Sequence, residues 1–273
     1  MRVTSIIVTR GRVDLLTRAI RSLTAQVGTA IELRVVIDDC QTTLDYLQGS
    51  ARIAGAVRSL EWQYLNRYKS ERSGPIRVAT LREAGLAIVQ TPYCAFLDDD
   101  NELEPHHYSL LASCIAEWRS VAAHSWRTLW TRQGAPYPLS DCHPWSRDLE
   151  VARQMFDHYC QTGIYQPNSQ VVRDQVVPHC REKSMVDTSE WLFDTSFLRE
   201  IKFAKQYSRD DWLLSRAEDN KLLDSIVESG VMIPSTCRPT LRYYLGGYSN
   251  DWAQEAAQLE GWVLPQEDSE PGR

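Results

Sequence analysis

The sequence predicts an α/β fold in which helices flank a mostly parallel, twisted sheet. Short apolar runs rich in β-branched residues alternate with helical segments, and each run ends in a polar turn. This alternation is typical of right-handed βαβ units, whose parallel strands bind ligands at their carboxyl ends. The length of 273 residues fits one elaborated domain and argues against two large independent ones.

The first half of the chain repeats the strand and helix pattern from its start. An apolar run at residues 4–9 is followed by Leu15, Leu16, Ala19, Ile20 and Leu23 at helical spacing. The later segments are a strand at 32–37, a helix at 42–51, a strand at 61–65, a helix at 78–89, a strand at 93–97 and a helix at 105–118. Residues 67–77 form a polar, basic loop between the third strand and the helix after it.

The pattern changes in the second half of the chain. The expected elements are a strand at 121–131, a turn at 134–138, a stretch rich in Trp, His and Cys up to about Arg181, a helix at 215–229 and a strand at 238–244. We interpret this half as a mixed α+β region on the same sheet. The predicted organisation is therefore a first half over 1–120, a second half over 121–250 and a C-terminal tail over 251–273.

Composition narrows the class of protein. The net charge of −6 argues against a surface that coats nucleic acid, because binding to phosphate backbones needs an excess of Lys and Arg. No apolar stretch approaches the roughly 20 residues that span a bilayer, so we expect at most peripheral membrane contact. Seven cysteines, an odd number, favour a reduced, cytoplasmic setting. Nothing in the sequence indicates an oligomeric state.

Three consecutive aspartates, Asp98, Asp99 and Asp100, follow a predicted apolar strand. Burying unpaired carboxylates costs several kcal/mol, so packing does not explain them. Oxygen ligands of this kind suit Mg²⁺ or Mn²⁺, which often share their coordination with substrate phosphates. The alternative is a solvated acidic turn at the start of the next helix.

A second acidic pair, Asp38 and Asp39, ends the second predicted strand. A carboxylate at this position accepts hydrogen bonds from a base or ribose in other α/β nucleotide-binding sheets, although it can equally cap the following helix. Arg77 and Arg82 follow in the next loop and helix. Their guanidinium groups are suited to a diphosphate, and the alternative for each is a solvated surface charge.

The helix expected at 215–229 opens with two adjacent carboxylates. Ser215 and Glu218 have the spacing of a capping box, which would give Glu218 a structural role. Asp219 is not needed for that cap and is a candidate general base, the alternative being a carboxylate that only stabilises the helix dipole.

Two further features of the second half have open interpretations. Trp191 precedes the carboxylate pair, and we expect its ring to line an acceptor site, with core packing as the alternative. The Cys- and His-rich stretch 142–180 invites a zinc site, but no pair of cysteines has the compact spacing of structural zinc sites. Serine hydrolase, zinc protease, P-loop and dinucleotide-binding motifs are absent from the sequence.

Several segments together resemble the inverting GT-A glycosyltransferases of family 2. The matching segments are 4–12 with 15–26, 36–39, 81–85, 96–101 with Pro105, 218–219, and Tyr244 with Ser249. Their order and spacing agree over residues 4–250. The resemblance implies a GT-A fold and transfer of a sugar, with inversion, from a nucleoside-diphosphate sugar, preferably a UDP-sugar, to an acceptor that the sequence does not identify.

The resemblance also implies a role for each matched residue. Asp219 would be the catalytic base, and Asp98 and Asp100 would hold Mn²⁺ or Mg²⁺. The residues expected to contact the donor are Thr9, Arg10, Asp39, Arg77, Arg82, Asp98 and Asp99. Apart from the resemblance, we expect Trp191 and Glu218 to lie on the acceptor side. Two alternatives remain open, a metal-dependent nucleotidyltransferase and a noncatalytic protein that binds nucleotide sugars.

Overall fold

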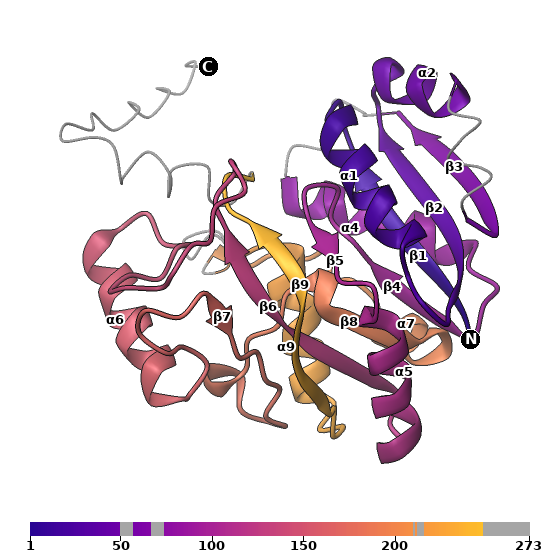
Figure 1. Cartoon of the computed structure of the whole chain (residues 1–273). Helices are drawn as coiled ribbons and strands as arrows, with labels where there is room; N and C mark the ends of the chain where they lie inside the picture. The colour runs from indigo at the N-terminus through magenta and orange to yellow at the C-terminus, as the bar shows by residue number, and fades with distance from the viewer. Residues whose placement is uncertain (50–56, 67–73, 210, 212–215, 248–273) are drawn as a thin grey trace.

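A computed structural model describes residues 1–49, 57–66, 74–209, 211 and 216–247 (Figure 1). Within these ranges, nine strands form one sheet in the order β3-β2-β1-β4-β8-β6-β9-β5, and β7 pairs with β6. The sheet is continuous across the two predicted halves, because β4 of the first half pairs with β8 of the second. The predicted tail at 251–273 lies outside the described residues. No helix in the described ranges is long and apolar enough to cross a membrane.

The first half is a parallel sheet, as predicted. Its strands are β1 (Arg2–Thr9), β2 (Ala30–Asp38), β3 (Ser59–Leu65) and β4 (Tyr93–Phe96), and every pair among them is parallel. The helices between them are α1 (Val13–Thr24), α2 (Gln41–Gly49) and α4 (Gly74–Ala87). All parallel strands therefore end at the same edge of the sheet, which is where ligands bind in such folds.

The first half ends with the short strand β5 (Glu102–Leu103) and helix α5 (His107–Trp118). The second half adds strands of both directions, which are β6 (Ala122–Trp130), β7 (Val171–Val172), β8 (Trp191–Asp194) and β9 (Ser235–Tyr244). Its helical segments are α6 (Leu149–Gln161), η1 (Arg181–Lys183), η2 (Thr188–Glu190), α7 (Thr195–Ile201) and α9 (Glu218–Glu228). β6 pairs antiparallel with β7 and β8 and parallel with β9, so this half is mixed, as expected.

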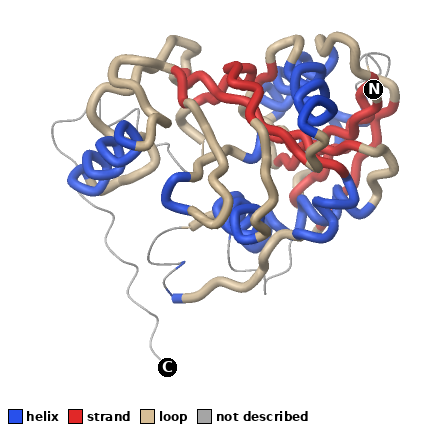
Figure 2. The backbone as a smooth tube through the Cα atoms, turned by 90° about the horizontal axis from the view of Figure 1, so that it is seen from below, coloured by secondary structure: helices blue, strands red, loops and turns tan. Residues whose placement is uncertain are grey.

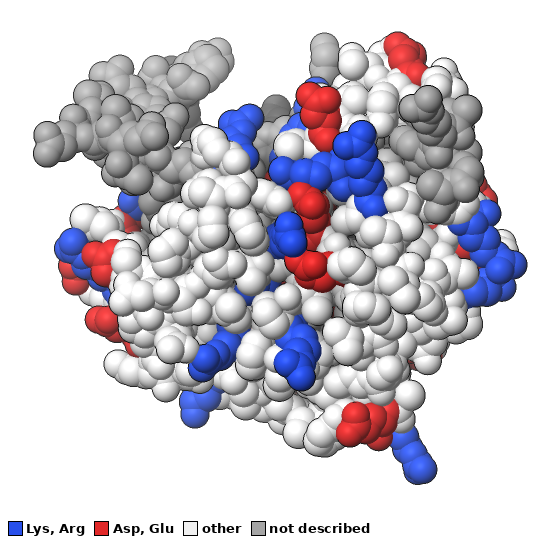
Figure 3. Space-filling view, viewed as in Figure 1, with Lys and Arg blue, Asp and Glu red and all other residues white. Residues whose placement is uncertain are grey.

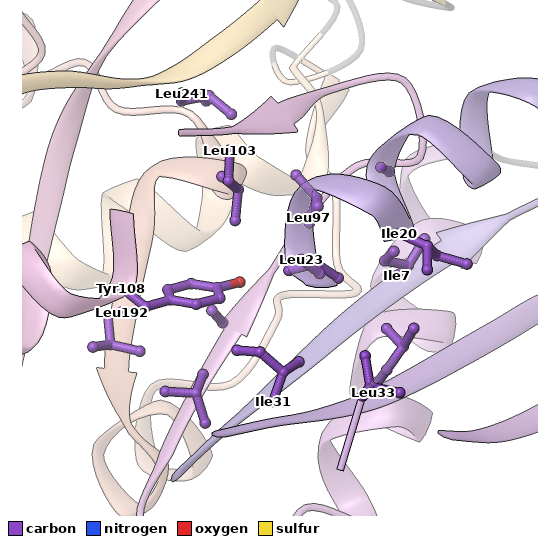
Figure 4. Close-up of a cluster of buried hydrophobic side chains, with 14 of the residues drawn as sticks. Ile7, Ile20, Leu23, Ile31, Leu33, Leu97, Leu103, Tyr108, Leu192 and Leu241 are labelled. Atoms are coloured by element: carbon purple, nitrogen blue, oxygen red, sulfur yellow. The ribbon is translucent and has the colours of Figure 1, made fainter. Parts of the chain in front are cut away.

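Helices cover both faces of the sheet, as Figure 2 shows. On one face, apolar residues of α1, α5 and β5 pack on the other strands, with Ile20, Leu23, Leu103 and Tyr108 among them (Figure 4). On the other face, α4, α7 and α9 bury a second cluster. A third cluster joins α6 to β6, β7 and β9. The layers hold the strand ends of both halves in fixed positions relative to one another.

Gly85 lets α4 pack directly on the sheet. A Cβ at this position would lie 2.6 Å from Ile6 Cγ2 and 3.0 Å from Val36 Cγ2, and both atoms belong to buried, β-branched side chains. We predict that Gly85→Ala destabilises the fold by about 1 to 3 kcal/mol, the usual cost of overpacking, although alanine favours a helix over glycine by about 1 kcal/mol. Urea unfolding would measure the change.

Gly74→Ala is the matched control for this prediction. Gly74 begins the same helix, and a Cβ there would meet nothing within 4 Å. Stability should stay the same or rise slightly in this variant. Equal effects of the two substitutions would contradict the close approach at Gly85.

Candidate active site

The carboxyl ends of the parallel strands meet at a cavity of about 500 Å³. β1 ends at Thr9, β2 ends at Asp38, and the three aspartates follow β4. The charged side chains that line the cavity are Arg10, Arg12, Arg77, Arg82, Asp38, Asp98, Asp99, Asp100, Asp187, Glu218 and Asp219. Most of the site residues predicted from the sequence therefore lie together, because the fold brings strand ends and the start of α9 to one place.

Arg82 joins the two halves of the site. Its Nη2 lies 2.8 Å from Asp98 Oδ1 and 3.2 Å from Glu218 Oε1, and its Nη1 donates to Thr188 Oγ1 at 2.7 Å. The side chain is 6% exposed. We predicted that Arg82 would meet a diphosphate, but in the structure its charge balances two carboxylates and holds them beside each other.

Arg12 forms a second charged centre, which the sequence pattern did not reveal. Its guanidinium pairs with Asp99 and, at 2.8 Å, with Asp100 Oδ2. Thr9 Oγ1 donates to Asp99 Oδ2 at 2.6 Å. Burial raises the pKa of the Asp99 carboxyl to about 7, while Arg12 opposes that rise. Arg12 could have been identified as a site residue from its position in the loop that directly follows the first strand.

Asp99 itself is fully buried, so one prediction needs correction. We expected Asp99 to contact the donor, yet it has no exposed area and its oxygens accept from Arg12 and Thr9. Thr9, at 2% exposed, is held in the same way. Both residues position Arg12 and the turn after β4 rather than offering a surface to a ligand.

Asp98 and Asp100 are the partly exposed carboxylates of the acidic turn, so they are the two that could contribute oxygen ligands to a divalent cation. The ion pairs use Asp98 Oδ1 and Asp100 Oδ2, and the side chains are 32% and 18% exposed. In the described part of the chain, no group of three or more His, Cys, Asp or Glu side chains is arranged to hold a metal ion. Substrate oxygens would therefore have to complete the coordination, as is common for Mg²⁺ sites.

The end of β2 is built around a buried ion pair. Arg77 Nε lies 2.9 Å from Asp38 Oδ1, and Arg77 Nη2 donates to the Leu65 carbonyl at 2.7 Å. Arg77 is 4% exposed, so the expected contact with a diphosphate is replaced by this pairing. Asp39 is partly exposed, with φ of 45°, and accepts a hydrogen bond from Tyr64 at 3.0 Å.

Among the described residues that line the cavity, Arg10 is the cation whose side chain is exposed. It lies in the loop after β1, and the structure records no ion pair for it among the described residues. A guanidinium that is exposed at a cavity is available to an anionic ligand. The position of Arg10 is therefore compatible with the prediction that this residue contacts the donor.

The two carboxylates of α9 have different surroundings. Glu218 is buried and pairs with Arg82, and burial raises the pKa of its carboxyl to about 7 against the effect of that arginine. Asp219 is half-buried and lines the cavity, and burial also raises its pKa, opposed by Arg82. The backbone N–H of Asn220 donates to Asp219 Oδ1 at 2.7 Å.

The predicted capping box at Ser215 and Glu218 is wrong. α9 begins at Glu218, so Glu218 is the first helical residue and not the third. The backbone N–H of Ala217 donates to Asn220 Oδ1 at 3.2 Å instead, and Ser215 lies outside the described residues. The ion pair with Arg82 determines where the Glu218 side chain lies. The spacing of residues along the chain cannot reveal such a pair.

Asp187 is a further cavity residue that was not predicted from the sequence. It caps η2: its Oδ1 accepts from the Ser189 N–H at 2.9 Å, and its own N–H donates to Glu190 Oε1 at 2.9 Å. Ser189 Oγ in turn accepts from the Asp98 N–H at 3.1 Å. The spacing of Asp187 and Glu190 is that of a capping box, which was the available signal.

The prediction that Trp191 lines the acceptor site is also wrong. Its side chain is 1% exposed, stacks on Phe193 with ring centres 5.1 Å apart and meets His124 edge to face. Trp191 begins β8, a central strand, so its ring points into the core between the sheet and its helices. Core packing, the alternative interpretation, is correct.

The Cys- and His-rich stretch forms no zinc site among the described residues. His143 is buried and bonds to the Tyr165 hydroxyl at 2.6 Å. His158 Nε2 lies 2.7 Å from the Glu182 carbonyl oxygen, and Cys180 Sγ lies 2.9 Å from Glu182 Oε1. These polar groups satisfy one another and serve the packing of α6.

Figure 3 shows acidic and basic side chains next to one another in the upper middle of the viewed face, while most of the remaining surface is uncharged. Ion pairs tie β5 to its neighbours: Arg18 lies 3.1 Å from Glu102, and Arg242 lies 2.6 Å from Glu104. Arg18 also stacks on the Tyr244 ring at 3.7 Å. These contacts fix β9 against α1 beside the site.

Together, the fold and the site define an α/β protein with carboxylates and arginines gathered at the carboxyl ends of parallel strands, where substrates bind in such sheets. The chain belongs to glycosyl transferase family 2, whose family model matches residues 4–177. Its fold is the GT-A fold. No curated protein matches the chain in sequence.

Solved structures of TarS from S. aureus share this fold. TarS 1-349 has a TM-score of 0.59 and 15% identity over 89% of this chain and 60% of that one. Its complex with UDP has a TM-score of 0.56 and 14% identity, covering 90% and 61%, and its complex with UDP-GlcNAc has 0.55 and 15%, covering 89% and 58%. The chain thus spans about 60% of the length of TarS 1-349. At these identities the likeness shows the fold alone.

Proposed function

We propose that this chain is a glycosyltransferase that transfers a sugar from a UDP-sugar with inversion, using Asp219 as the general base and Mn²⁺ or Mg²⁺ at Asp98 and Asp100. One observation carries the proposal: Asp219 lies at the same cavity as Asp98 and Asp100, although it comes from the other half of the chain. Arg82 holds Asp98 beside Glu218, the neighbour of Asp219.

The surroundings of Asp219 suit a base. Its carboxyl has a raised pKa, which brings it closer to the operating pH, where a general base is most effective. It would take the proton of the acceptor hydroxyl as the oxygen attacks the anomeric carbon. A single in-line displacement inverts that carbon and needs only one base, by analogy with inverting glycosidases.

The arginines of the cavity suit a diphosphate. Arg10 is exposed there, and Arg12 is 28% exposed while it pairs with Asp99 and Asp100. Asp98 and Asp100 would hold the cation, whose charge counters the negative charge that develops on the leaving group. TarS structures that contain UDP and UDP-GlcNAc support the choice of UDP, since they share the fold.

We predict that turnover of a UDP-sugar needs a divalent cation. UDP affinity, measured by titration calorimetry, should rise with Mn²⁺, and EDTA should abolish UDP release from the donor. In Asp100→Asn, the gain in affinity with Mn²⁺ should fall by about tenfold or more, because one carboxylate ligand is lost. Thermal unfolding would verify that the variant is folded.

Asp157→Asn is the control for this experiment, because Asp157 is exposed on α6 and does not line the cavity. It should bind UDP and Mn²⁺ as the natural protein does. Full turnover in EDTA would exclude the metal, and the absence of cleavage with every UDP-sugar tested would exclude the donor class.

A further inference from the structure

The negative charges of the cavity differ in how they are balanced. Asp38 pairs with Arg77, Asp99 and Asp100 pair with Arg12, and Asp98 and Glu218 pair with Arg82. Asp219 has no ion pair recorded among the described residues, and the nearest recorded cation to Asp187 is Arg127, at 3.8 Å. Asp187 and Asp219 are therefore the cavity carboxylates that have no charged hydrogen-bond partner among the described residues.

Asp187 is held rigidly, with one oxygen directed away from its own backbone contacts. Oδ1 accepts the Ser189 N–H, while the 3.8 Å contact with Arg127 involves Oδ2 and is too long for a hydrogen bond. Arg127 is itself engaged by Glu190 at 2.9 Å and by Asp174 at 3.3 Å. A carboxylate that is held at a cavity wall in this way can accept a hydrogen bond from a hydroxyl group of a ligand.

An aromatic wall adjoins this carboxylate. Tyr243 lines the cavity, and its hydroxyl accepts from Trp145 Nε1 at 3.1 Å. The Trp145 and Tyr243 rings meet edge to face at 5.4 Å, and the Arg127 guanidinium lies 5.0 Å and 5.4 Å from their centres. Arg127 thus lies against the aromatic wall and 3.8 Å from the carboxylate next to it.

We propose that Asp187 is an acceptor-binding residue, which accepts a hydrogen bond from a hydroxyl group next to the attacking one, and that the acceptor is an uncharged sugar or polyol. This inference rests on the proposed function of Asp219. Hydroxyl groups are donors that suit two acceptor-only carboxylates, and the apolar face of a sugar ring suits contact with the Tyr243 ring. A phosphate or carboxylate on the acceptor would be repelled by these two carboxylates, neither of which is hydrogen-bonded to a cation among the described residues.

The proposal is tested with neutral 4-nitrophenyl glycosides, each paired with the uronide of the same ring. The readout is acceptor-stimulated release of UDP from the donor. The natural protein should use neutral members and reject their uronides. A preference for any uronide, or no stimulation by any neutral member, would overturn the proposal.

Asp187→Asn tests the residue itself. Asparagine still caps η2, so the fold is retained, but the charge is lost. For the best neutral acceptor, KM should rise about tenfold or more, the loss expected for a hydrogen bond to a charged group, whereas kcat and UDP affinity change little. Discrimination against the uronide should also weaken, a result that a purely structural residue would not produce.

Asp174→Asn is the matched control, because Asp174 also pairs with Arg127 but is fully buried and does not line the cavity. An equal rise of acceptor KM in this variant would show that Asp187 acts only through Arg127 and would overturn the proposal. Release of UDP from the donor in water alone separates the two hypotheses. If the natural protein cleaves the donor but the acceptor experiments do not give the results expected above, only the inference about Asp187 fails. If the protein cleaves no UDP-sugar, both the inference and the proposed function fail.

Discussion

Asp219→Asn should lower kcat by about 10²- to 10⁴-fold, the usual contribution of general base catalysis. Asparagine keeps the size of the side chain and an oxygen that can accept the Asn220 N–H, but it cannot take a proton at neutral pH. UDP affinity and thermal stability should change little. Steady-state kinetics with saturating acceptor would measure kcat, and calorimetry would measure UDP binding.

The pH profile provides a second test of this assignment. A base acts only when it is deprotonated, so kcat of the natural enzyme should rise with pH through the raised pKa of Asp219 and then level off. The residual activity of Asp219→Asn should lack that rise. A variant that keeps more than about a tenth of the natural kcat, where chemistry limits turnover, would exclude Asp219 as the base.

Asp224→Asn is the control on the same helix. Asp224 pairs with Arg181 and Arg216 and does not line the cavity. Its replacement should affect stability and leave kcat near the natural value. A comparable loss of kcat in both variants would indicate that displacement of α9, and not loss of the base, explains the effect.

Arg82→Met should destabilise the fold by about 3 to 5 kcal/mol, the cost of removing one partner from a buried ion pair. Methionine fills much of the same space but leaves Glu218 buried without its cation and removes the partner of Asp98. The free energy of unfolding, measured by denaturant titration, would report the loss. Activity should also fall, because Arg82 positions residues of both halves of the site.

The pH dependence of that loss has a defined sign. The pKa of Glu218 in the folded protein is already raised to about 7, and removal of Arg82 raises it further. The variant therefore loses most stability above this range, where Glu218 must be charged, and the difference from the natural protein should shrink as pH falls below about 7. A difference that is constant with pH would contradict the ion pair as its cause.

Arg10→Met is the control for the loss of an arginine. Arg10 is exposed and has no ion pair recorded among the described residues. Its replacement should change stability by less than about 0.5 kcal/mol, as for most surface substitutions. UDP affinity, in contrast, should fall if Arg10 contacts the diphosphate.

Long elements with a clear hydrophobic pattern were predicted well from the sequence. The strands at 4–9 and 32–37 and the helix at 105–118 correspond to β1, β2 and α5 with small shifts at their ends. Short elements were not: β8, a central strand, has only the residues Trp191–Asp194. A segment as short as β8 cannot show a periodic pattern. It forms a strand because it pairs with β4 and β6, and both of these strands are distant from it in the chain.

The alternation of strands and helices, the acidic turn after β4 and the carboxylate pair of α9 could be predicted from the sequence, because each depends on neighbouring residues. Which charges meet became visible only in the folded structure. It paired Arg82 with Glu218, placed Arg12 between Asp99 and Asp100, and brought Asp187 to the cavity. It also buried Trp191. Burial and ion pairing depend on residues that are far apart in the chain, and these become neighbours only when the sheet and its helices have assembled.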